Sequence, residues 1–151
     1  MALIDSRLEF CSATALNTGG AGNYNIGDVV DTTVARDLGV GKQMYLCIGV
    51  TTTATSGGSA TGTFSLLTSA AADLGTPSVV VTSPTWAVAS MTAGRKLFVV
   101  ALPQEGTTYL RYLGVRQTTG TAAFTAGAID AYLTTEPPSW KAYPDGLPAG
   151  S

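Results

Sequence analysis

The sequence contains no histidine and few charged residues, and each shortage excludes a class of function. Lys and Arg total 8, Asp and Glu total 10, and charged residues make up 12% of the 151 residues, where about a quarter is usual. Without histidine the chain has no His-ligated metal site and no histidine acid–base catalysis. A formal net charge of −2 leaves no excess of cations for phosphate backbones, so we expect no nucleic-acid partner.

Long apolar runs are also missing. The longest strongly apolar run is Leu97–Leu102, far short of the roughly 18 residues that span a bilayer. Asp5 and Glu9 interrupt the N-terminal segment, where a signal peptide needs apolar residues. We therefore expect no membrane partner and synthesis in the cytoplasm.

Cysteine is scarce, and its two positions favour packing over chemistry. Cys11 and Cys47 both lie in apolar, strand-like segments, and they do not form a Cys-x-x-Cys motif. This placement favours two buried thiols, which behave as small hydrophobic side chains. The alternative is a disulfide between them.

What the chain has in abundance is turn-forming and β-branched residues. There are 18 glycines, 7 prolines and 23 threonines, and apolar runs alternate with turn clusters such as Asn17–Asn23 and Ser56–Ser59. This pattern predicts an all-β chain folded as a two-sheet antiparallel sandwich of jelly-roll type. We expect about eight strands, near residues 7–13, 28–35, 43–54, 61–68, 78–82, 95–103, 107–116 and 121–133.

Two segments depart from this pattern. Ser69–Leu74 holds three consecutive alanines after a capping serine, which predicts one short helix. Residues 136–148 hold four prolines, which favour an extended, stiff chain and argue against a central strand. We therefore expect a β-sandwich domain over residues 1–135, with an extended N-terminal arm, and a proline-rich C-terminal arm over residues 136–151.

Motifs for catalysis, cofactors and metals are incomplete. Leu38–Gln43 contains a Gly-Lys pair, but Arg36 and Gln43 occupy positions where a phosphate loop needs glycine and Ser or Thr. On a strand, Asp28 and Asp31 would face opposite sides, which disfavours a shared calcium ion. We predict no catalytic residue, no metal and no cofactor, and hence that the protein is not an enzyme.

The densest basic points other than Arg95-Lys96 are Arg111 and Arg116, with Tyr112 between them. One interpretation is a solvated strand face with stacked aromatic rings. The other is a rim of charge that meets an acidic partner surface. In the C-terminal arm, Trp140 and Tyr143 either pack against the chain's own sandwich or insert into a neighbour's groove.

Four segments resemble a known family in their order and length: Ile4–Phe10, Asp37–Gly39, Thr61–Thr68 and Arg111–Leu133. The family is the capsid cement (decoration) proteins of tailed bacteriophages, typified by the cement protein of a Bordetella short-tailed phage. The resemblance implies a jelly-roll subunit on the outer surface of an icosahedral head. There it would bridge neighbouring major capsid proteins and stabilise the expanded shell.

The resemblance also implies partners and a location. The partners would be the major capsid protein of the same phage and further copies of this chain, as a homodimer or a trimer. The protein would be made in the host bacterial cytoplasm and end in the virion. Candidate contacts lie in the two arms and at the basic points: Leu3, Ile4, Arg7, Arg111, Arg116, Trp140 and Tyr143.

Two alternatives belong to other functional classes. One is a receptor- or carbohydrate-binding β-sandwich, which would present an exposed aromatic platform from Trp86, Trp140, Tyr24 or Tyr109. The other is a different minor virion protein, of the tail or of head closure, for which we expect a similar composition.

Overall fold

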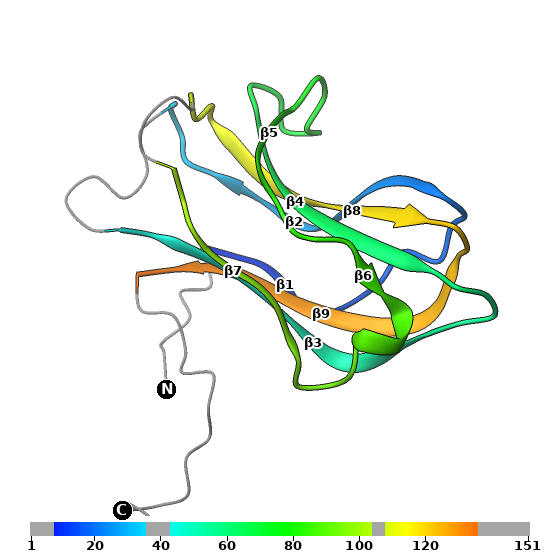
Figure 1. The fold of residues 1–151 in the computed structure, drawn as a ribbon. Coiled ribbons are helices and arrows are strands. Elements are labelled where there is room, and N and C mark those ends of the chain that lie inside the picture. The colour runs from blue at the N-terminus through cyan, green and yellow to red at the C-terminus, as the bar shows by residue number, and fades with distance from the viewer. Residues whose placement is uncertain (1–7, 36–42, 104–107, 136–151) are drawn as a thin grey trace, which may run out of the picture.

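The fold is a sandwich of two antiparallel β-sheets (Figure 1). The structure is a computed structural model that describes residues 8–35, 43–103 and 108–135. Sheet A has the strand order β1, β9, β3, β7, and sheet B has the order β2, β8, β4, β5, with the short β6 paired to β4. The strands are β1 (Glu9–Ala15), β2 (Gly22–Asp31), β3 (Tyr45–Ser56), β4 (Thr61–Ser69), β5 (Ser78–Thr82), β6 (Trp86–Ala87), β7 (Lys96–Ala101), β8 (Tyr112–Gly120) and β9 (Phe124–Thr134).

This strand order is that of a jelly roll. The first and last strands, β1 and β9, pair in sheet A, and the second and second-last, β2 and β8, pair in sheet B. The chain therefore crosses from one sheet to the other at most of its connections, as two interlocked Greek keys do. The expected all-β sandwich of jelly-roll type is confirmed. The two arms predicted at the chain ends lie outside the described residues.

Each of the eight predicted runs corresponds to a strand, but both ends of β2 and of β8 are displaced from the predicted runs 28–35 and 107–116, and one element differs. Strand β2 begins at Gly22, six residues before the predicted start, and β8 continues to Gly120. Strand β6 was not predicted. A single turn of 3₁₀ helix, η2 (Val88–Ser90), follows it.

The short helix predicted at Ser69–Leu74 is wrong, and the segment forms a turn. The Ser69 hydroxyl accepts a hydrogen bond from the backbone N–H of Ala71 at 3.1 Å, as a cap would. The same hydroxyl donates to the carbonyl of Gly75 at 2.7 Å, which closes the turn. Leu74 then adopts a left-handed backbone with φ +56°, which ends a right-handed helix, and its side chain is buried.

The core lies between the sheets because the strands alternate in burial. On β8, Leu113 and Val115 point inward and are fully buried, whereas Arg116 and Thr118 are half-buried on the outer face. Three buried phenylalanines, Phe10, Phe64 and Phe124, come from both sheets and join one continuous apolar cluster.

The sandwich is closed along the side where β1 and β2 meet. Gly27 has φ +75° at a bulge in β2, and a Cβ there would lie 2.2 Å from the carbonyl oxygen of Phe10. The same Cβ would lie 2.4 Å from the sulfur of Cys11. Only glycine combines this backbone conformation with such a close approach between the two sheets.

A buried glutamine connects the β1–β2 loop to the middle of sheet B. Gln117 is fully buried. Its Oε1 accepts a hydrogen bond from the N–H of Asn17 at 2.9 Å, and its Nε2 donates to the carbonyl of Asn17 at 3.1 Å and to Oγ1 of Thr119 at 2.8 Å. The side chain thus satisfies both backbone groups of a loop residue inside the protein.

We predict that Gln117→Leu lowers the free energy of unfolding by about 2–3 kcal/mol, because it removes the partners of the partly buried backbone groups of Asn17 and of the buried Thr119 hydroxyl. Urea unfolding followed by circular dichroism measures this. The matched control is Thr118→Val on the outer face, which should cost less than about 1 kcal/mol. Equal losses for the two variants would contradict the role of Gln117.

Candidate interaction surface

The outer face of sheet B is polar, and we call it the hydroxyl face. Outward positions on its strands carry mainly hydroxyl and amide side chains, and the segment that follows β5 adds one more threonine. The residues of the hydroxyl face are Asn23, Asn25, Thr61, Thr63, Ser65, Thr82, Thr85, Arg116 and Thr118, of which Ser65 is itself buried.

Hydrogen bonds between strands hold these side chains in place. The hydroxyls of Ser65 and Thr82 lie 3.1 Å apart, and those of Thr63 and Thr85 lie 3.0 Å apart. The Thr118 hydroxyl donates to the side-chain oxygen of Asn23 at 2.7 Å. A partner that binds here would meet side chains that are already ordered, which lowers the entropic cost of binding.

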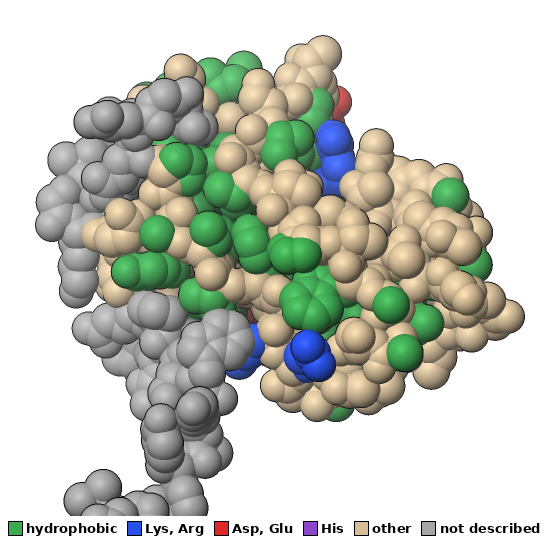
Figure 2. Space-filling view, in the orientation of Figure 1, with side chains coloured by type: hydrophobic (Ala, Val, Ile, Leu, Met, Phe, Trp, Pro, Cys, Tyr) green, Lys and Arg blue, Asp and Glu red, His purple; other side chains and the backbone are tan. Residues whose placement is uncertain are grey.

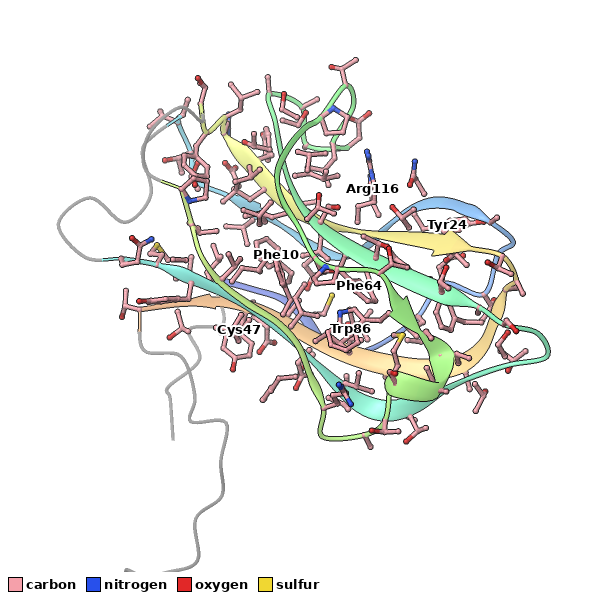
Figure 3. All side chains as sticks on the ribbon, viewed as in Figure 1. Phe10, Tyr24, Cys47, Phe64, Trp86 and Arg116 are labelled. Carbon is pink, nitrogen blue, oxygen red and sulfur yellow. The ribbon has the colours of Figure 1, made fainter. Side chains whose placement is uncertain are left out.

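Arg116 carries the charge of the hydroxyl face. On β8 it is paired with Asn25 of β2 on one side and with Ser65 of β4 on the other. Figure 3 shows that Arg116 points outward, whereas Phe64 points into the space between the sheets. The Nε of Arg116 is buried and has no hydrogen-bond partner among the described residues.

Arg111, just before β8, has an ion-pair partner among the described residues, unlike Arg116. Its Nε and one terminal nitrogen donate to the two carboxylate oxygens of Asp31 at 2.8 and 2.9 Å, and its guanidinium lies 4.9 Å from the centre of the Tyr112 ring. Its hydrogen bond, together with one from the N–H of Thr33, lowers the pKa of Asp31 to about 2. The pKa of Arg111 is raised by the same hydrogen bond.

The two predicted arginines therefore lie along the same side of sheet B but differ in what they can bind. Arg111 is already paired within the chain, whereas Arg116 has no ion pair with any residue that the structure describes. The other predicted contacts, Leu3, Ile4, Arg7, Trp140 and Tyr143, lie outside the described residues and stay predictions.

A second surface feature is apolar and lies where the sandwich is open, between β5 and β7. Val80, Trp86, Phe98 and Val100 are each partly buried against the core and partly exposed. Figure 2 shows hydrophobic side chains gathered between the two sheets on this side. The guanidinium of Arg95 lies 5.0 Å from the centre of the Trp86 ring, which is a cation–π contact.

One of the four aromatic residues considered for a sugar-binding platform is not on the surface. Tyr109 is buried, and its hydroxyl donates to the carbonyl of Pro103 at 2.5 Å. Tyr24 is half-buried, with its hydroxyl bonded to the carbonyl of Gly20 at 2.8 Å. Trp86 is half-buried beneath Arg95, and Trp140 lies outside the described residues.

The described part of the chain has no pocket or cluster of side chains suited to catalysis or metal binding. There is no pocket there, and no cluster of three or more Cys, Asp or Glu side chains that could hold a metal ion. No described helix has the length and apolar character to cross a membrane. Asp31, one of the two carboxylates weighed for calcium, is bound to Arg111 instead.

Both cysteines are free and buried, as the sequence predicted. Cys11 joins the core cluster, and burial is the main cause that raises its pKa to about 12. Cys47 faces outward from sheet A beside Tyr132, and burial raises its pKa to about 11. Thiolate is the reactive form, so burial and the raised pKa disfavour reaction of either thiol in the folded protein.

The hydroxyl face was not predicted as a site from the sequence, apart from Arg116. A signal was present, because Thr61, Thr63 and Ser65 alternate with buried residues along β4. The alternation reveals a two-faced strand, but the hydroxyls of β5 and β8 join it only through strand pairing.

We predict that the Asp31–Arg111 ion pair contributes stability that is fully present above about pH 4. This contribution should be lost as the pH falls through the folded-state pKa of about 2, because the unfolded carboxyl binds a proton first. Carboxyl NMR should place the Asp31 midpoint near 2 and, in Arg111→Gln, move it up toward 3.8. An unchanged midpoint in the variant would contradict the assignment.

We predict that neither native thiol reacts with a maleimide at pH 7.5 in the folded protein, since both are buried and protonated. Mass spectrometry should show no adducts after a time in which the urea-unfolded chain gains two. Rapid labelling of either cysteine without denaturant would show that its side of the sandwich opens.

One comparison with known proteins identifies the family. No curated protein matches the chain. The family model named Bbp16 matches residues 10–133, a range that runs from β1 to β9 and so includes both sheets. The chain therefore belongs to the Bbp16 family, a family of Bordetella phage proteins.

Proposed function

We propose that this protein is a capsid cement, or decoration, protein that binds the outside of an icosahedral phage head. It bridges neighbouring major capsid proteins and stabilises the expanded shell. The observation that carries the proposal is the match of residues 10–133 to a family of Bordetella phage proteins. The segments that resemble cement proteins fall largely within the same range.

The surface of the sandwich supports a protein-binding role. The buried centres of protein interfaces are depleted in charged residues and enriched in aromatic residues and arginine. The apolar strip around Trp86 and Phe98 has this composition, and the hydroxyl face shares its shortage of charge and contributes Arg116. Both areas serve to contact other proteins, and this role requires no catalytic chemistry.

The mechanism of stabilisation is thermodynamic linkage. A protein that binds only the expanded lattice lowers the free energy of that lattice by an amount that grows with its concentration and affinity. Many identical sites act on one shell, so modest affinity at each site stabilises the whole head. A subunit that contacts two capsid proteins gains further from the high effective concentration of the second site.

The proposal includes the partners and the place of action. The major capsid protein of the same phage is the main partner, and a second copy of this chain forms a homodimer, with a trimer as the alternative. The protein is made in the host bacterial cytoplasm and acts on the outer surface of the virion. Residues of the two arms, Leu3, Ile4, Arg7, Trp140 and Tyr143, add shell contacts.

The sugar-binding alternative is less well supported. Its platform needed aromatic rings exposed together, but Tyr109 is buried in the core and bonded to Pro103. A role in the tail or in head closure is compatible with the same family and fold. It is the alternative that the following experiment separates from cementing.

We predict that the purified full-length chain co-sediments with expanded head shells of its own phage that lack it. Binding should saturate at a fixed copy number per shell, because the lattice repeats one site. Compact shells should bind little, and expanded shells already carrying the protein provide the control for filled sites. Absence of binding to expanded shells would refute the proposal and favour a tail or head-closure role.

A further inference from the structure

Arg116 is a cation without a counter-ion in the middle of an uncharged face. Its neighbours across the strands are Asn25 and Ser65, and no described residue forms an ion pair or hydrogen bond with it. We infer that the hydroxyl face is the surface that docks on the shell, with Arg116 binding a carboxylate of the shell protein. This inference rests on the proposed function and names the side of the protein and the chemistry involved.

The Arg116 side chain contains a buried donor that makes no hydrogen bond with any described residue. A buried N–H without a partner is unfavourable, because it has lost its water without gaining a hydrogen bond. The Nε of Arg116 is such a group. The two terminal nitrogens of Arg116 are not buried in this way, and together they form a fork that matches the two oxygens of a carboxylate, so one carboxylate of a partner would bind them and pair the charge.

The same chain shows what a satisfied arginine of this kind looks like. Arg111 uses its Nε and a terminal nitrogen to bind both oxygens of Asp31 at 2.8 and 2.9 Å. Among the described residues, Arg116 has no equivalent of Asp31. Asp73 lies in the turn beside Leu74, whose side chain lies against Gly114 of the same face, but its carboxylate accepts a hydrogen bond from Gly75 at 2.9 Å and forms no ion pair with Arg116.

The rest of the face indicates that the carboxylate belongs to a protein surface. Binding a nucleic-acid backbone requires several cations, and the hydroxyl face has Arg116 alone among its residues. Threonine, serine and asparagine side chains can both donate and accept hydrogen bonds, as the backbone of a protein loop requires. Because several of them are already paired by hydrogen bonds, they form an ordered surface around the arginine.

The first test compares arginine variants in shell binding. Arg116→Gln should weaken binding to expanded shells by about 30-fold or more, because it removes one partner of a desolvated charge pair. Arg116→Lys should recover only part of this loss, because it keeps the charge but not the fork. Arg111→Gln and, on sheet A, Lys96→Gln each remove one positive charge elsewhere and should bind within about threefold of the wild type.

The second test locates the face directly and does not depend on affinity. Asn25→Cys places a thiol beside Arg116, and Ala126→Cys places an exposed thiol on sheet A as the matched control. The native cysteines are buried and should not interfere. On expanded shells, the thiol at residue 25 should lose its maleimide reactivity at least tenfold, while the thiol at residue 126 keeps it.

The outcomes separate this inference from the proposed function. If the wild type binds shells but Arg116→Gln binds equally well and the thiol at residue 25 stays reactive, the inference is wrong and the cement function stands. If the wild type does not bind shells, both are wrong. Equal melting temperatures for Arg116→Gln and the wild type establish that lost binding does not reflect lost folding.

Discussion

The pairing of β8 with strands on both of its sides is the constraint on which the rest of the structure depends. β8 lies between β2 and β4, so its register fixes the register of most of sheet B. Its inward side chains, Leu113 and Val115, belong to the core, and the next outward one, Arg116, belongs to the hydroxyl face. A slip of one residue would exchange these sets and place a guanidinium in the core.

Two contacts specify that register. Gln117 is bonded to both backbone groups of Asn17, which a shifted strand could not provide. Gly114 leaves room on the outer face for Leu74, whose side chain would lie 2.3 Å from a Cβ at that position. The first contact acts from inside the sandwich and the second from outside, so together they orient the strand that carries Arg116.

The fold could largely be predicted from the sequence, because alternation and turn residues are local signals. The early part of β2 could not, since Gly22–Ile26 has the composition of a turn and becomes a strand only by pairing with β8. The prediction of a helix at Ser69–Leu74 was wrong for a similar reason. Its alanines favour a helix, but burial of Leu74 against Gly114 requires a turn.

The candidate site could be predicted only in part. Sequence proximity selected Arg111 and Arg116 together, but the carboxylate that distinguishes them, Asp31, lies 80 residues from Arg111 along the chain. The hydroxyl face draws on four strands, and of the neighbouring pairs only β4 and β5 are consecutive in sequence. Which arginine is free, and what surrounds it, are therefore properties of the strand order of the jelly roll.

A cryo-electron microscopy reconstruction of heads assembled with this protein tests the central claim most directly. The account predicts one sandwich-shaped density at each lattice site on the outside of the expanded shell. The outer face of sheet B should lie against the capsid protein, with Arg116 beside a carboxylate. Density only at the tail or the portal vertex would contradict the cement function, and a shell-bound sandwich with the hydroxyl face toward solvent would contradict the docking surface.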